Sequence, residues 1–153
     1  AWMFAILAAV AGFFTLRGGK LFRRSEATHD VRLEIVVEGR TATLHALVDS
    51  GNLLTDPLSG RSVIVADPAK LTPQLPVGLL DALAHPTEAR EKYARRVRLI
   101  PARTATGEGM LAAFAPDRLT VIDGRERTEA NDLVALSPLG DAAKGFDALI
   151  SLE

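Results

Sequence analysis

The sequence predicts a mainly β protein, a closed barrel of short strands, preceded by the end of a membrane-spanning helix. Apolar and polar residues alternate along several short runs, turn-forming residues separate these runs, and the first 16 residues carry no charge. The 153 residues suit one globular domain. Because only 5% of them are aromatic, we expect a core built from Ala, Val, Leu and Ile.

Residues 1–16 form an uncharged apolar run that predicts the C-terminal part of a transmembrane helix. As an α-helix this run would rise about 24 Å, which is short of a hydrocarbon core of about 30 Å. We therefore expect a truncated span that continues upstream, with a buried core helix as the alternative. A signal peptide carries its positive charges before the apolar run, whereas here they follow it.

Residues 17–28 predict a basic juxtamembrane linker that sets topology and touches anionic lipid, through Arg17, Lys20, Arg23 and Arg24. Such a cluster marks the cytoplasmic side of a membrane, so we expect the following domain in the cytoplasm. Residues 1–24 hold four of the 18 basic side chains and none of the 19 acidic ones, so the remaining 129 residues carry −5. This acidic balance argues against nucleic acid as a partner.

A β-hairpin is predicted directly after the linker. Residues 31–37 and 42–48 each alternate between apolar and polar side chains, and Glu38-Gly39-Arg40 supplies the turn between them. The second strand becomes more apolar toward its end and leads into the turn-rich tetrapeptide Asp49-Ser50-Gly51-Asn52.

Further short strands are expected along the rest of the chain, at residues 62–66, 97–101, 110–114, 119–123, 133–136 and 148–152. Two helices, residues 77–84 and 87–96, are predicted between the first two of these strands and are separated by Pro86.

Asp49 is the candidate catalytic residue, with Ser50 and Gly51 supporting its loop. An aspartic peptidase needs two carboxylates about 3 Å apart that share one proton, one acting as a base on water and the other as an acid. In a D-[ST]-G triplet the hydroxyl holds the loop, and glycine lets backbone N–H groups approach the carboxylate. The alternative is an Asx-type turn that closes a hairpin.

The chain contains a single D-[ST]-G triplet. One chain therefore supplies one catalytic carboxylate, and a peptidase built from it has to be a homodimer with the site on its two-fold axis.

Four blocks of the sequence resemble the sporulation sigma-E factor-processing peptidases of endospore-forming bacteria. They are residues 47–60 with the following strand 63–65, residues 100–104, residues 109–117 and residues 146–150. The resemblance covers essentially the whole chain.

This resemblance implies a multi-pass protein of the cell membrane whose last span includes residues 1–16. It implies a retropepsin-like aspartic protease domain at residues 29–153, with Asp49 as the catalytic aspartate. The implied substrate is the precursor of a sigma factor used in the mother cell, and the implied trigger is a signalling protein from the forespore. Retroviral proteases differ in having Ala where Asn52 stands and glycine where Ser151 stands.

Other candidate sites are weaker. His45 lies on the same strand face as Asp49, but no G-x-S-x-G elbow supports a serine hydrolase built on Ser50. His29 and His85 have no second ligand at metal spacing, so we expect no metal or other cofactor.

Two further segments have two open interpretations each. The glycine-rich residues 106–109 form a plain hairpin turn or a mobile flap over substrate. Arg95, Arg96 and Arg98 bind acidic residues of a substrate or form a solvated helix end.

The sequence thus predicts a membrane-tethered, homodimeric aspartic endopeptidase. The alternative from another class is a non-catalytic β-barrel domain, anchored to the membrane, that serves dimerisation or sensing. In that case Asp49 only closes a turn.

Overall fold

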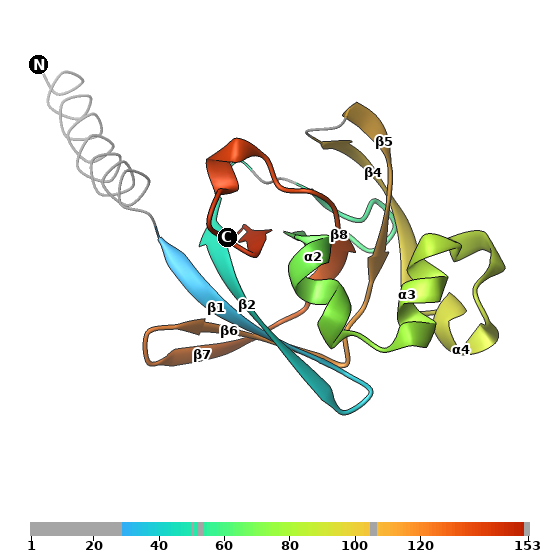
Figure 1. Ribbon diagram of the computed structural model, residues 1–153, viewed down its shortest axis with the longest axis horizontal. Coiled ribbons are helices and arrows are strands. Elements are labelled where there is room, and N and C mark those ends of the chain that lie inside the picture. The colour runs from blue at the N-terminus through green and yellow to red at the C-terminus, as the bar shows by residue number, and fades with distance from the viewer. Residues whose placement is uncertain (1–28, 50, 52–53, 105–106, 152–153) are drawn as a thin grey trace, which may run out of the picture.

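The computed structural model describes residues 29–49, 51, 54–104 and 107–151. Nine strands form one sheet in the order β4-β5-β8-β3-β9-β2-β1-β6-β7 (Figure 1). The strands are β1 (Asp30–Val37), β2 (Arg40–Val48), β3 (Val63–Ala66), β4 (Val97–Thr104), β5 (Gly107–Phe114), β6 (Arg118–Asp123), β7 (Glu126–Ala130), β8 (Leu133–Leu136) and β9 (Ala148–Ile150).

The expected mainly β class is confirmed, but the sheet is not closed into a barrel. Within the described residues β4 pairs only with β5, and β7 pairs only with β6, so these two strands are the open edges. The reason lies in β7, whose sequence Glu-Arg-Thr-Glu-Ala is mostly exposed. A strand without an apolar face gains nothing from packing back across the core.

The hairpin of β1 and β2 forms as predicted. Val31, Leu33 and Ile35 point into the core, and the pairing of Val37 with Arg40 leaves a two-residue turn. Glu38 and Gly39 both have positive φ, 51° and 76°, which makes this a type I′ turn whose twist matches the flanking strands.

The main core lies between the β1–β2 hairpin with β6 and a helical segment inserted between β3 and β4. This segment comprises α2 (Pro68–Leu71), η1 (Thr72–Gln74), α3 (Val77–Ala84), η2 (Pro86–Glu88) and α4 (Glu91–Ala94). Leu71 and Leu79 are fully buried against the sheet residues, and each contributes about 1.5–3 kcal/mol by leaving water. Figure 1 shows α3 and α4 on the β4–β5 side of the molecule, away from the β6–β7 hairpin.

The predicted helix 77–84 is confirmed, whereas the continuous helix predicted over 87–96 is wrong. Ala89 and Arg90 adopt extended ψ values of 135° and 150°, which separate η2 from a four-residue α4. Pairs at i, i+4 contribute only a few tenths of a kcal/mol each, and here Lys92 pairs with Glu38 of the β1–β2 turn.

In the part of the chain that the structure describes, no helix has the length and apolar character needed to cross a membrane. The predicted membrane segment at residues 1–16 and the predicted linker at residues 17–28 lie outside the described residues.

Candidate active site

Asp49 follows the last residue of β2 and is held there by backbone hydrogen bonds. Its N–H donates to the carbonyl of Ile150 at 2.8 Å, and the preceding Val48 N–H donates to the carbonyl of His29 at 3.0 Å. The side chain is neither fully buried nor fully exposed. The sheet therefore fixes the main chain up to Asp49, and the residue stays partly exposed.

The loop after Asp49 turns tightly around its carboxylate. Oδ1 of Asp49 accepts a hydrogen bond from the Gly51 N–H at 2.9 Å, and a Cβ atom on Gly51 would lie only 3.2 Å from the same oxygen. Any larger residue at this position would push the carboxylate away by a few tenths of an ångström, so glycine suits this close approach. Ser50 and Asn52 lie outside the described residues. An Asx-type turn and a catalytic D-[ST]-G loop share this local geometry, so both interpretations of the triplet fit it.

The strand β9 braces the Asp49 loop. It pairs in parallel with β2, Val48 opposite Ile150, and in antiparallel fashion with β3. Hence β9 lies between two strands that follow one another in the chain. The absence of glycine at Ser151 does not prevent this brace, because the pairing uses the backbone of Ala148 to Ile150.

A second ordered turn, residues 56–60, follows the loop and is organised by Asp56. Its side chain is only 1% exposed. Its two oxygens accept from the Leu58 N–H at 3.1 Å and from the Ser59 hydroxyl at 2.6 Å. The Ser59 hydrogen bond is the main reason that the pKa of Asp56 is lowered. Asp56 was not among the predicted site residues, and the Asp-x-x-Ser spacing is the sequence signal that could have identified it.

His45 is occupied by partners other than Asp49. Its ring contacts the carboxylate of Asp30 and packs at 5.2 Å, between centroids, on Phe146. Its backbone N–H donates to the Asp147 carboxylate at 2.9 Å. These contacts give no support to a serine-hydrolase arrangement.

A second histidine, His29, has Nε2 3.0 Å from Oδ2 of Asp123. Among the described residues no group of three or more His, Cys, Asp or Glu side chains is arranged to hold a metal ion.

Of the glycine-rich residues 106–109 the structure describes 107–109, which begin β5 of the β4–β5 hairpin, and Gly107 pairs there with Thr104 of β4. Leu99 and Met110 of this hairpin are exposed, and Arg103 forms an ion pair with Glu108 near the tip. The hairpin fits either of the two predicted interpretations, a plain turn or a flap.

Arg96 is engaged within the chain. Its guanidinium donates to the carbonyl of Ala115 at 2.8 Å and to the carboxylate of Asp117 at 2.7 Å. It is therefore wrong to count Arg96 among arginines that are free to meet a substrate. Arg95 and Arg98 remain exposed.

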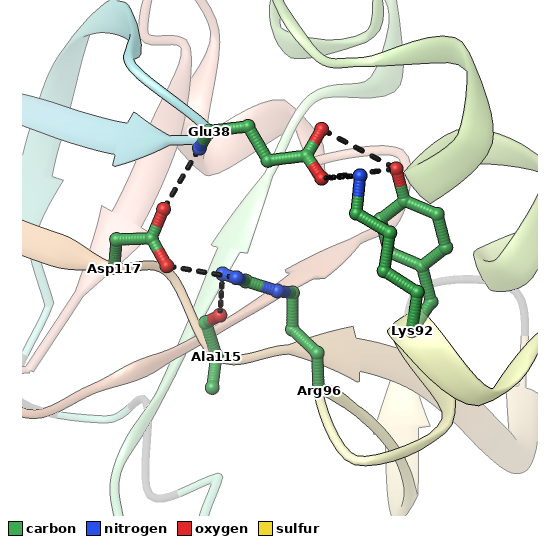
Figure 2. Close-up of polar contacts among 6 residues, drawn as sticks. Glu38, Lys92, Arg96, Ala115 and Asp117 are labelled. Atoms are coloured by element: carbon green, nitrogen blue, oxygen red, sulfur yellow. Dashed lines mark hydrogen bonds and ion pairs between the residues drawn. The ribbon is translucent and has the colours of Figure 1, made fainter.

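A polar network joins the β1–β2 turn to the helical segment and to the chain before β6 (Figure 2). The Glu38 carboxylate lies 2.5 Å from Nζ of Lys92 and accepts from the Tyr93 hydroxyl at 3.2 Å. The Glu38 N–H donates to Asp117 at 2.7 Å, and Asp117 in turn pairs with Arg96. These hydrogen bonds and ion pairs connect the β1–β2 turn, the helical segment and the chain before β6. They lie at the opposite end of β2 from Asp49.

The hydrogen bonds and ion pairs of this network shift the pKa values of Glu38, Lys92 and Asp117. The hydrogen bond from Lys92 lowers the pKa of Glu38, and the same contact raises the pKa of Lys92. The pKa of Asp117 is lowered, first by the Glu38 N–H and then by Arg96. All three groups are held in their charged forms at neutral pH.

Comparison with known proteins gives a family-level match over almost the whole chain. The model of the sporulation factor SpoIIGA family, peptidase family U4, matches residues 1–151. This chain belongs to the SpoIIGA family. The match includes Asp49 and both of the strands, β2 and β9, that position it.

Two curated relatives of this SpoIIGA family member carry the name sporulation sigma-E factor-processing peptidase. The relative from Priestia megaterium is 26% identical over 131 residues, which cover 79% of this chain and 43% of the relative. The relative from Bacillus subtilis is 28% identical over 163 aligned residues, covering 97% of this chain and 53% of the relative. The chain therefore spans about half the length of the curated relatives that it matches. No solved structure matches it.

Proposed function

We propose that this chain is the catalytic portion of a membrane-tethered, homodimeric aspartic endopeptidase that processes the precursor of a sporulation sigma factor. The substrate class rests on the names of the two curated relatives. The main structural support is the placement of Asp49, fixed between β2 and β9, with Oδ1 in the Gly51 turn.

In this proposal two copies of Asp49 meet across a two-fold axis, and one proton is shared between their carboxylates. One carboxylate takes a proton from water as the water oxygen attacks the scissile carbonyl carbon. The other protonates the leaving nitrogen as the C–N bond breaks. Ser50 and Gly51 support the loop that carries Asp49 in each copy. No cofactor takes part.

Residues 1–16 would be the end of the last transmembrane helix, and residues 17–28 the basic linker on the cytoplasmic side, in the mother cell. Tethering two domains to one surface raises their effective concentration. A signalling protein from the forespore that rearranges the spans would thereby control assembly of the dyad.

Two substitutions at Asp49 separate catalysis from turn formation. In Asp49→Asn the side-chain oxygen still accepts from the Gly51 N–H, but the ionisable group is lost. In Asp49→Ala both are lost. The proposal expects neither variant to cleave the precursor while both stay folded. A non-catalytic domain in which Asp49 only closes the turn would tolerate Asp49→Asn, and retained processing by that variant would rule out the peptidase.

The homodimer is tested by mixing wild type with Asp49→Asn in the same membrane. If each site needs two copies of Asp49, an equal mixture with random pairing retains about a quarter of the wild-type activity. A monomeric site would retain about half.

A further inference from the structure

The charged residues of β7, at the free edge of the sheet, are complementary to those of a second, antiparallel β7. Strand β7 is exposed, pairs only with β6 within the described residues, and lies at the end of the sheet three places from β2. Its residues from Glu126 to Ala130 place Arg127 and Glu129 symmetrically on either side of Thr128.

The backbone groups at this edge follow from the β6–β7 turn. Gly124 has a φ of 62°, and no positive φ occurs at Arg125, which makes the turn between Asp123 and Glu126 type II′. Such a turn closes with a hydrogen-bonded pair, Asp123 with Glu126, and hydrogen-bonded and non-hydrogen-bonded pairs then alternate. The N–H and C=O groups of Arg127 and Glu129 therefore point away from β6, toward the open edge.

We propose that β7 pairs antiparallel with β7 of a second copy of this chain, about a two-fold axis at Thr128. Arg127 then lies opposite Glu129 of the other copy, and Glu129 opposite Arg127, so each exchanges backbone hydrogen bonds with its partner. Opposite charges in directly opposed positions stabilise an antiparallel pair. A parallel pairing in register would place arginine against arginine and glutamate against glutamate.

The side chains are already arranged for this contact. Arg127 donates to Glu34 at 2.8 Å on the same face of the sheet, and a guanidinium has enough donors to bind a second carboxylate beside it. Glu129 is exposed and forms no ion pair with another described residue, so its carboxylate can meet the second copy. The contact would complete the row Glu34, Arg127, Glu129.

A five-residue strand pair buries little surface, so the association is weak in solution and stronger between copies held on one membrane. It is separate from the proposed pairing of Asp49, because β7 and β2 are different parts of the sheet. A chain that uses both contacts would link peptidase dimers into rows.

The chain has no cysteine, so engineered thiols report this geometry directly. In the proposed pair Thr128 faces Thr128 as a non-hydrogen-bonded pair, with Cα atoms about 4.5 Å apart, which suits a disulfide. The Cα atoms of Glu126 in the two copies would lie about 14 Å apart. With the full chain in phosphatidylcholine vesicles under mild oxidation, Thr128→Cys should cross-link several-fold more than Glu126→Cys. Equal cross-linking of the two variants would overturn the proposal.

Charge reversal provides an independent test in the Thr128→Cys background. Glu129→Arg and Arg127→Glu each place like charges opposite one another, so either variant alone should associate about threefold to tenfold less. A mixture of the two variants, distinguished by a mass tag, places arginine opposite glutamate at both positions and should restore cross-linking between unlike chains. Failure of the mixture to do so, with both variants folded, would also overturn the proposal.

The Asp49→Asn variant keeps the two proposals apart. It should cross-link through Thr128→Cys as wild type does, even though processing is lost. A Thr128→Cys chain with Asp49 intact that processes the precursor but does not cross-link would contradict the β7 contact alone.

Discussion

The backbone N–H of Glu38 donates to Oδ2 of Asp117 at 2.7 Å, and Glu38 is the one described non-glycine residue with a positive φ. A side chain in this backbone region is strained, and such a conformation persists where neighbouring contacts enforce it. Here Lys92 and Tyr93 hold the carboxylate of Glu38 while Asp117 holds its N–H. The polar network of Figure 2 thus maintains the type I′ turn.

Asp117→Ala should lower the free energy of unfolding by about 1–2 kcal/mol, since it removes the acceptor of the Glu38 N–H and the partner of Arg96. Asp123→Ala is the control, because it removes an exposed pair with His29 that is expected to contribute about 0–1 kcal/mol. Urea unfolding measures both. Equal losses would show that the turn does not depend on Asp117.

Ser59→Ala should shift acid unfolding to higher pH. The hydrogen bond from Ser59 lowers the pKa of Asp56 in the folded state. Stability from this carboxylate is complete above its unfolded pKa, about 3.9, and is lost as pH falls through the lower folded value. Without the hydroxyl the folded pKa of Asp56 rises toward the unfolded value, so the carboxylate stabilises the fold less and its contribution is fully lost at a higher pH.

Circular dichroism across an acid titration measures this shift. Ser137→Ala is the control, since among the described residues its hydroxyl makes only a long bond, 3.5 Å, to a carbonyl. An unchanged acid midpoint in Ser59→Ala would contradict the role assigned to the hydroxyl.

Asp132→Asn should stabilise the fold at pH 7 and have less effect at pH 3. Burial raises the pKa of Asp132, partly offset by Arg61, so the folded state disfavours the charged carboxylate. The free energy of unfolding of the wild type therefore falls as pH rises from the unfolded pKa, about 3.9, through the raised pKa of folded Asp132. Asparagine cannot ionise, so the variant does not show this loss. Thermal unfolding at both pH values, with the exposed Asp81→Asn as control, measures the difference. A gain of equal size at both pH values would contradict it.

Gly51→Ala should reduce the proposed processing activity several-fold with little change in thermal stability. The added Cβ would lie 3.2 Å from Oδ1 of Asp49 and would shift the carboxylate, while Gly51 itself is exposed. Gly140→Ala is the matched control, because its Cβ would meet nothing within 4 Å. Precursor cleavage and melting temperature are measured for both variants. Normal cleavage by Gly51→Ala would show that the tight turn is dispensable.

The first two strands could be predicted because their burial alternates. The run from Val31 to Val37 buries every second residue, and the observed strand extends the prediction by a single residue. By contrast β7 was missed, since its stability comes from the adjoining turn and from pairing with β6, and its sequence has no apolar face. The four-residue α2 was missed for a similar reason: Asp67 caps it and Pro68 begins it, but it is too short to show a helical period.

The site could be predicted only in its local part. Asp49 and Gly51 were recognisable because turn chemistry depends on adjacent residues. Two long-range contacts could not be predicted: that of Asp49 with Ile150, and that of Glu38 with Asp117. No hydrophobic period or motif spacing links residues so far apart. The contacts of the His45 ring with Asp30 and Phe146 could not be predicted for the same reason.

The insertion of β9 between β2 and β3 also has a consequence for the order of folding. Asp49 receives its support from a strand about 100 residues later, and such distant pairings form slowly. During synthesis, at about 5–20 residues per second, the Asp49 loop leaves the ribosome well before Ile150 exists. A nascent chain therefore holds Asp49 on an unbraced loop, and the support from β9 forms only after the chain has been made as far as Ile150.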